Sequence, residues 1–523
     1  MRDAALGFIL LLMGADAASA ASFDLGDGVR LDWDNDVAGT GSDQEERSLA
    51  YHPAGSASAV YQSRDSATGR FDWLSELEIS DGDFGIRASA RAALGDLYEA
   101  LGPSDLYVLR YVGSVAAPPG STRHTDLVPL DAFVHGSFPI DGDGRLSFRI
   151  GRHSLLWGES IYFPENGIAA GQAPIDATQF EPISGYQPAL PTLPVGQISA
   201  SYQAGGGLSL EGYWQFEYRA SRISAIGSYD VPNALLAPAD LARLIAVPAD
   251  ADADAFRFAP SQTEEPSPIG QFGLAVRWRV GDVDLGLYGE RWTAKTPTIF
   301  LHIPGPGYGT PGTYDLLYPD GIETIGASAA FHLGDANLGA EISGRRGMPL
   351  VTAGVVVPSG SSDLALQPIG DTFHAQLSFL YTTPPLPLIA AGATWTGEIA
   401  LNDVLSAANA PEIMPGRTRF AAAFRTVFEP QFYQVVPRLD LSVPIGIGYG
   451  LIGSSETDPT MTRRTGDISV GLTARFDQVW RAGIEFTHYL GRDQVPYLPF
   501  QPNDAIDPVA AGDFLSLSVE RKF

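Results

Sequence analysis

Hydrophobic and polar residues alternate along many short segments, and the last segment shows the pattern most clearly. In an extended strand over 514–523, the mostly apolar face holds Leu515, Leu517, Val519, Arg521 and Phe523. The opposite face holds Ser516, Ser518, Glu520 and Lys522. A period of two with one apolar face predicts a β-strand. A final strand that ends on an aromatic residue is typical of outer-membrane β-barrels, so we interpret Phe523 as a membrane-insertion signal.

Four further segments repeat this alternation: 145–150, 272–280, 468–476 and 479–486. In the second of them, the apolar positions are Phe272, Leu274, Val276, Trp278 and Val280. Each segment reads as a strand with one face toward lipid and one face toward a polar interior.

The connections between predicted strands alternate between short and long. Short ones carry turn signals such as Gly281-Asp282 and Gly334-Asp335. The long ones cover 35–70, 93–126, 152–194, 219–268, 293–320, 346–370, 402–417, 444–465 and 490–513. This asymmetry predicts an all-β fold, an antiparallel up-and-down transmembrane barrel with about 16–18 strands, short periplasmic turns and long extracellular loops. Sixteen strands would result if 28–34 did not join the sheet. A soluble sandwich, solenoid or propeller is the alternative, but the chain has no fixed repeat period.

The first 20 residues predict a secretory signal peptide. Arg2 precedes an apolar run from Leu6 to Met13, and small residues at 18–20 provide a cleavage site near Ala20. The apolar run is too short for a transmembrane helix. We therefore expect residues 21–523 to form the barrel in the outer membrane of a Gram-negative bacterium.

Composition restricts the chemistry further. The chain has 523 residues, no cysteine and a formal net charge of −28. The absence of cysteine excludes disulfides and thiolate metal sites. The acidity argues against nucleic acid as a partner, because nucleic-acid binding needs a basic surface.

The long connection 219–268 differs from the others. Apolar residues in 233–247 have nearly helical spacing, which predicts a short helix in a loop. Asp250, Asp252 and Asp254 follow, but they lack the glycine and distal glutamate of an EF-hand loop. A solvated acidic linker is the simpler interpretation.

Several motifs carry a family resemblance. They are the segment 151–160 with sequence GRHSLLWGES, Asn166-Gly-Ile168, Pro174-Ile-Asp176, and the strand 208–216 with sequence LSLEGYWQF. Together with 23–30 and 75–78 they resemble a large proteobacterial outer-membrane family of unknown function, domain of unknown function 1302. His153 stands where that family usually has glutamine.

The resemblance implies an outer-membrane barrel that handles a hydrophobic or amphipathic small molecule of the lipid, sterol or hydrocarbon class. It also implies a periplasmic carrier and an inner-membrane exporter as partners. Any such barrel would contact outer-membrane lipid and lipopolysaccharide and would be inserted by the barrel assembly machinery.

The connection 152–194 is rich in proline, glycine and aromatic residues, which need a dry environment. We expect it to fold into the lumen as a constriction or plug. The candidate cargo-contacting residues are Arg152, Trp157, Glu159, Tyr162, Phe163, Phe180 and Tyr186. Strand parity predicts a set of lumen charges, namely Glu76, Glu78, Arg149, Arg277, Arg279, Glu290, Arg475, Arg481 and Glu485. These charges could act as a selectivity filter or only as ion pairs that hold strands together.

Catalytic motifs are missing from the sequence. It has no His-Glu-x-x-His and no Gly-x-Ser-x-Gly. We therefore predict no enzyme activity, no catalytic or metal residues and no cofactor, although a hydrolase assembled across strands would leave no local motif. The leading hypothesis is an outer-membrane channel for a hydrophobic or amphipathic molecule. A weakly selective hydrophilic porin and a surface-binding barrel are the alternatives.

Overall fold

The computed structural model describes residues 21–44, 47–51, 59–63, 66–95, 124–140, 142–176, 192–222, 259–263, 266–302, 313–352, 355–357, 362–386, 391–491 and 513–523. The predicted signal peptide, the predicted helix in 233–247 and Asp250, Asp252 and Asp254 lie outside these residues. No helix in the described part of the chain is both long and apolar enough to cross a membrane.

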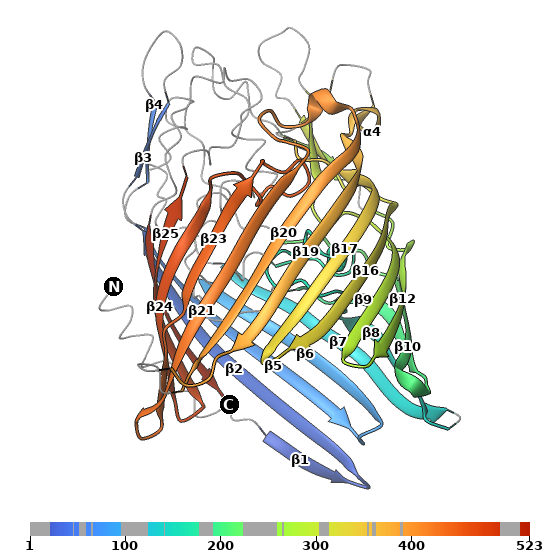
Figure 1. The fold of residues 1–523 in the computed structure, drawn as a ribbon, viewed down its shortest axis with the longest axis vertical. Coiled ribbons are helices and arrows are strands. Elements are labelled where there is room, and N and C mark those ends of the chain that lie inside the picture. The colour runs from blue at the N-terminus through green and yellow to red at the C-terminus, as the bar shows by residue number, and fades with distance from the viewer. Residues whose placement is uncertain are drawn as a thin grey trace.

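Neighbouring strands pair antiparallel around a closed barrel (Figure 1). The first half of the wall is β2 (Val29–Gln44), β5 (Ser66–Ser80), β6 (Phe84–Gly95), β7 (His124–Ile140), β8 (Gly144–His153), β9 (Val195–Gln203), β10 (Leu208–Gln215), β12 (Gln271–Val280) and β13 (Val283–Trp292). The second half is β16 (Ile322–Leu333), β17 (Ala336–Pro349), β19 (Ile369–Thr382), β20 (Ala393–Ala408), β21 (Ala421–Val436), β23 (Ile445–Ile452), β24 (Gly466–Phe476), β25 (Trp480–Leu490) and β26 (Phe514–Lys522).

The barrel closes between its first and last strands. Residues Asp36–Gln44 of β2 pair with Lys522–Phe514 of β26. The sheet has 20 strand pieces. Of these, β22 (Leu439–Ser442) directly precedes β23 and pairs with the same two neighbours, β21 and β24, so that β22 and β23 form one strand of the wall. The piece β1 (Ala21–Gly26) pairs only with β2. The closed wall therefore has 18 strands, the upper end of the predicted range, and 28–34 does join it.

The two ends of the barrel differ as the sequence predicts. Tight turns such as Gly281-Asp282 join strands at one end, which we call the turn end. Longer connections join them at the other, the loop end (Figure 1). Short elements at the loop end are β3 (Arg47–Tyr51) with β4 (Ala59–Ser63), a sheet of β11 (Ala259–Thr263), β15 (Thr313–Leu317), β14 (Thr298–His302) and β18 (Val355–Val357), α4 (Asp363–Leu366) and η5 (Ala410–Glu412). The helical turn η3 (Gly205–Gly207) lies at the turn end, and η1 (Ile168–Gly171) lies inside the barrel.

Alternating exposure along the strands separates an apolar outer face from a polar inner face. On β12, Leu274 is 69% exposed, whereas its neighbour Ala275 is 3% exposed. The final strand behaves likewise, with Leu517 at 41% and Ser516 at 2%. Arg521, the one charge on the apolar face of β26, lies 4.2 Å from the ring centroid of Phe523, so the aromatic end of the chain covers it. The predicted fold class is therefore confirmed.

The structure extends two strands beyond their predicted ends. The interval 35–70 was expected to be a loop, yet β2 continues to Gln44 and β5 begins at Ser66. Glycine, serine and aspartate dominate this part of β2, which hides its strand character from a hydrophobicity pattern. Cross-strand backbone bonds to β5 and β26 keep it extended.

Candidate functional site

The described residues after β8 turn back into the barrel instead of extending outward. We call residues 154–176 the plug segment. Its backbone meets the inward-facing side chains of β17 and β20, and η1 lies within it. Gly158 permits the turn at its tip, because its φ is +91° and a Cβ there would collide with the Glu341 carboxylate. Residues 154–176 of this connection therefore lie against the inner face of β17 and β20.

Two buried glutamates of the wall bind the plug backbone. Glu341 on β17 accepts hydrogen bonds from the amides of Glu159, at 2.7 Å, and Ile168. Glu398 on β20 accepts from the amides of Ile161, at 2.7 Å, and Tyr162, and from the Ser160 hydroxyl at 3.0 Å. Hydrogen bonds to a charged acceptor are the strong ones. These two carboxylates therefore fix the tip of the plug segment.

A buried arginine of the wall binds carbonyl oxygens of the same plug backbone. Arg345 on β17 donates to the carbonyl oxygen of Glu165 at 2.8 Å and to that of Gly167 at 2.7 Å. Backbone N–H and C=O groups away from water need hydrogen-bond partners. Side chains of the wall provide these partners for the plug, as backbone groups do within a helix or sheet.

Asn166 connects the plug segment to β19 and, again, to β20. Its side-chain nitrogen donates to Gln376 at 3.2 Å, and its oxygen accepts from Asn402 at 3.1 Å and lies 3.0 Å from the ring of His374. Asn166, His374 and Asn402 are each at most 2% exposed. An amide bound on both ends has one fitting orientation, so this contact sets the register of the plug against the wall.

Apolar side chains of the plug segment fill gaps left by wall glycines. A Cβ on Gly273 would lie 2.9 Å from the Trp157 ring, and a Cβ on Gly326 would lie 2.7 Å from Ile168. The Trp157 ring packs against Tyr213, with centroids 5.1 Å apart, and its indole nitrogen donates to Glu211 at 3.0 Å. The plug is thus packed as well as hydrogen-bonded to β10–β20.

The predicted cargo-contacting residues divide into three groups. Trp157, Glu159, Tyr162 and Phe163 are inside the barrel, where Tyr162 bonds Thr396 at 2.6 Å and Phe163 packs against Ala400, Ala423 and Met461. Their aromatic rings face the wall. Phe180 and Tyr186 lie outside the described residues.

Arg152 differs from its prediction. It was expected to contact cargo in the lumen, but it shares the outward parity of Ile150, which is 42% exposed. It binds Glu217 beside Gly196 at the loop end of the wall. The strand continues through Gly151 to His153, so Arg152 is still a strand residue and alternation places it outside.

The plug segment leaves space on the opposite side of the lumen. A cavity of about 340 Å³ lies between β5–β8 and the plug, lined on the wall by residues that include Leu74, Arg87, Leu130, Asp131 and Phe133. His153, Ser154, Thr192 and Pro194 line its other side. A second cavity of about 280 Å³ shares Glu76 and Arg87 with the first and continues to Arg30, Asp32 and Asp34. We call the two together the side passage.

Charges of both signs face one another in the side passage. Arg87 lies 2.5 Å from Glu76, 3.4 Å from Glu78 and 3.6 Å from Asp131. Arg149 stacks over Phe133, 5.8 Å from its centroid. Three of the predicted lumen charges, Glu76, Glu78 and Arg149, thus lie in or beside the passage.

The other predicted lumen charges are elsewhere in the barrel. Glu290 accepts from Tyr213 at 3.0 Å behind the plug, and Glu485 is 2% exposed beside Thr487. Arg277 lies 3.9 Å from Glu211. Arg279, Arg475 and Arg481 lie toward the turn end, where Arg279 binds Asp284 at 2.7 Å and Arg481 lies 3.9 Å from Glu520.

An ion-pair cluster joins the plug segment to the wall beside the passage. Asp176 of the plug binds Arg91 of β6 at 2.9 Å and Arg222 at 3.3 Å. Arg91 also lies 3.6 Å from Asp72. Sequence reasoning did not select Arg87, Arg91, Glu341, Arg345 or Glu398, although inward parity on strands 84–95, 336–349 and 393–408 would have found them.

The solved structures that match the chain include outer membrane proteins. The chain is similar to the outer membrane protein OpdK of Pseudomonas aeruginosa, with 10% identity, 94% of this chain and 99% of that chain covered, and a TM-score of 0.41. Acinetobacter baumannii OccAB1 has 10% identity, 94% and 96% coverage and a TM-score of 0.42. Vibrio cholerae OmpT has 10% identity, 95% and 98% coverage and a TM-score of 0.35.

No curated protein sequence matches the chain. A family model does, over residues 1–523, and its description is a protein of unknown function, DUF1302. The residues that carry the resemblance include the plug tip, Trp157-Gly158-Glu159, and the strand that receives Trp157. The chain is a member of the DUF1302 family and folds as an 18-stranded barrel of the outer-membrane type.

Proposed function

We propose that this protein is a selective outer-membrane channel for small amphipathic molecules, and that they cross through the side passage between the plug segment and β5–β8. The observation that carries the proposal is the uneven attachment of the plug, whose tip is held by β17 and β20, while Asp176 pairs with Arg91 of β6 beside the passage. The plug packs against and hydrogen-bonds to strands between β10 and β20, whereas the cavities are lined by β2 and β5–β8.

The lining of the side passage determines the class of solute. Arg87, Asp131 and Glu76 present charge, whereas Leu74, Leu130 and Phe133 present an apolar surface within the same cavity. A molecule with a charged or polar group and an apolar part would find partners for both. Mixed charge favours selection by orientation over strong preference for one ionic sign.

The structure supports a purely hydrophobic cargo less strongly than the sequence does. That hypothesis rested on the family resemblance, on the predicted helix in 233–247 and on the aromatic residues of 152–194, of which Trp157 and Phe163 pack into the wall. The side passage has apolar and charged residues in the same cavity, which supports an amphipathic molecule as the cargo.

A wide hydrophilic porin is the second candidate, and the charged wall of the passage favours it. Single-channel conductance of the refolded protein distinguishes the two. The narrow channel predicts small conductance and uptake of amphipathic solutes into liposomes that depends on Arg87. Large, ohmic conductance with equal permeation of neutral sugars would overturn our proposal.

The cellular setting is part of the same proposal. We place the barrel in the outer membrane of a Gram-negative bacterium, with the loop end in contact with lipopolysaccharide and insertion by the barrel assembly machinery. A periplasmic carrier or an inner-membrane exporter would meet the turn end. There the β1–β2 hairpin offers a strand, β1, that pairs on one side only among the described residues.

A further inference from the structure

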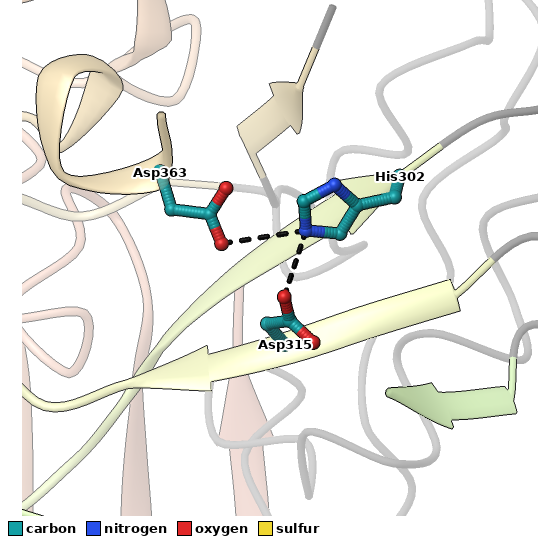
Figure 2. A group of neighbouring side chains, drawn as sticks. All are labelled: His302, Asp315 and Asp363. Atoms are coloured by element: carbon teal, nitrogen blue, oxygen red, sulfur yellow. Dashed lines mark hydrogen bonds and ion pairs between the residues drawn. The ribbon is translucent and has the colours of Figure 1, made fainter. Parts of the chain in front are cut away.

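Three metal-ligating side chains converge at the loop end, in a cluster that the side passage does not use. They are His302 at the end of β14, Asp315 in the middle of β15 and Asp363 at the start of α4 (Figure 2). The imidazole nitrogen Nε2 of His302 lies 2.9 Å from Asp315 Oδ2 and 3.3 Å from Asp363 Oδ2.

A packed framework positions the three residues. His302 and Asp315 come from paired strands, and β18 pairs with the other edge of β14. Beneath them, Phe300, Val355 and Val357 form a buried cluster, and Leu366 of α4 packs against it. The cluster therefore holds segments distant in the sequence at fixed positions, which is what a preorganised binding site needs.

One ring nitrogen faces two carboxylates in this cluster. Nε2 can carry only one proton, and Figure 2 shows that both carboxylates approach it from different directions. A divalent cation at the point between the three donors would neutralise both carboxylates.

Two of the three donor separations suit a small tetrahedral ion, and all three donor atoms lie within 4.8 Å of one another. Ligand atoms about 2.0–2.1 Å from Zn²⁺ are separated by about 3.3–3.4 Å in a tetrahedron, close to the 2.9 and 3.3 Å found here. An imidazole nitrogen with two carboxylate oxygens is a Zn²⁺ ligand set, whereas Ca²⁺ takes six to eight oxygens.

We propose that His302, Asp315 and Asp363 form a divalent transition-metal site that takes Zn²⁺, with a fourth position open to water. The ion would tie the β14–β15 hairpin to α4. It would thereby fasten the connection after β13 to the connection after β17 at the loop end.

The test is calorimetric titration of Zn²⁺ into the refolded full chain, with Mg²⁺ in excess to occupy weak acidic sites. We expect one tight site, and at least about 10–100-fold weaker binding in H302A, D315N and D363N, since even the loss of a residue that orients a ligand has that effect. H488A is the matched control, because His488 lies 2.6 Å from Asp513 and forms no three-ligand group among the described residues.

Two results would overturn the site. One is a wild-type protein that binds Zn²⁺ no better than D315N, which would leave only a His–Asp ion pair. The other is an equal loss of binding in H488A. Heat-shifted gel mobility establishes that each variant is a folded barrel, and the Asn substitutions preserve side-chain size.

Discussion

Removing the Glu398 carboxylate should loosen the plug segment. In Glu398→Ala, the Ile161 and Tyr162 amides and the Ser160 hydroxyl lose their acceptor. An unsatisfied buried donor costs about 1–3 kcal/mol, so two amides cost about 2–6 kcal/mol. Because Ile161 and Tyr162 are only half-buried, water replaces part of the loss, and we use the lower value. About 2 kcal/mol raises the population of a displaced plug about 30-fold.

Single-channel recording in a planar bilayer measures that population directly. Wild type should show small, steady conductance, whereas Glu398→Ala should show frequent larger openings. Glu341→Ala combined with Glu398→Ala should increase them further, because four plug amides are then without acceptors. The control is Glu323→Ala, which removes a half-exposed carboxylate paired with Arg346. Unchanged conductance in the folded double variant would refute a plug held by these carboxylates.

Three further predictions concern the plug and the passage. Gly158→Ala should also increase the frequency of large openings in planar bilayers, since the φ of +91° and the Glu341 carboxylate exclude a methyl group at this position. Recordings of the variant that do not differ from those of the wild type would contradict this. Arg87→Gln should reduce uptake of anionic amphipathic solutes into liposomes by about 10-fold, through loss of about 1–2 kcal/mol of charged hydrogen bonding, with no change for neutral solutes. Burial, then Asp458, raises the pKa of Glu165 to about 7. Plug docking should therefore be strongest below about pH 4.5 and weaken as the pH rises through 7, so that openings become more frequent over that interval. Glu165→Gln should reduce this pH dependence, and an unchanged dependence would contradict the assignment.

Local periodicity was sufficient to predict the barrel but not the arrangement of its interior. The alternation in 272–280 and 514–523 reports which side of a strand faces lipid, and both strands behave as predicted. The fate of 152–194 depends on partners such as Glu341 and Glu398, which are about 180 and 240 residues away along the chain. No local pattern links them, so the insertion was predictable only from its composition.

Arg152 shows the same limit at a single residue. Its charge suggested an inward position, but continued pairing of β8 through Gly151 to His153 places it outside, beside Glu217. The end of a strand is the least certain part of a sequence prediction, and a shift of one residue reverses the face. Glu76 and Glu78, in the middle of β5, carried no such ambiguity.

The most direct test of the account is thiol-reagent block of single cysteines in an otherwise cysteine-free chain. Ser154→Cys places a thiol in the side passage, and Ser343→Cys places one on the inner face of β17, 4% exposed, on the wall that binds the plug. A charged methanethiosulfonate should reduce conductance through Ser154→Cys and leave Ser343→Cys unaffected. Block at Ser343→Cys with none at Ser154→Cys would contradict the side passage.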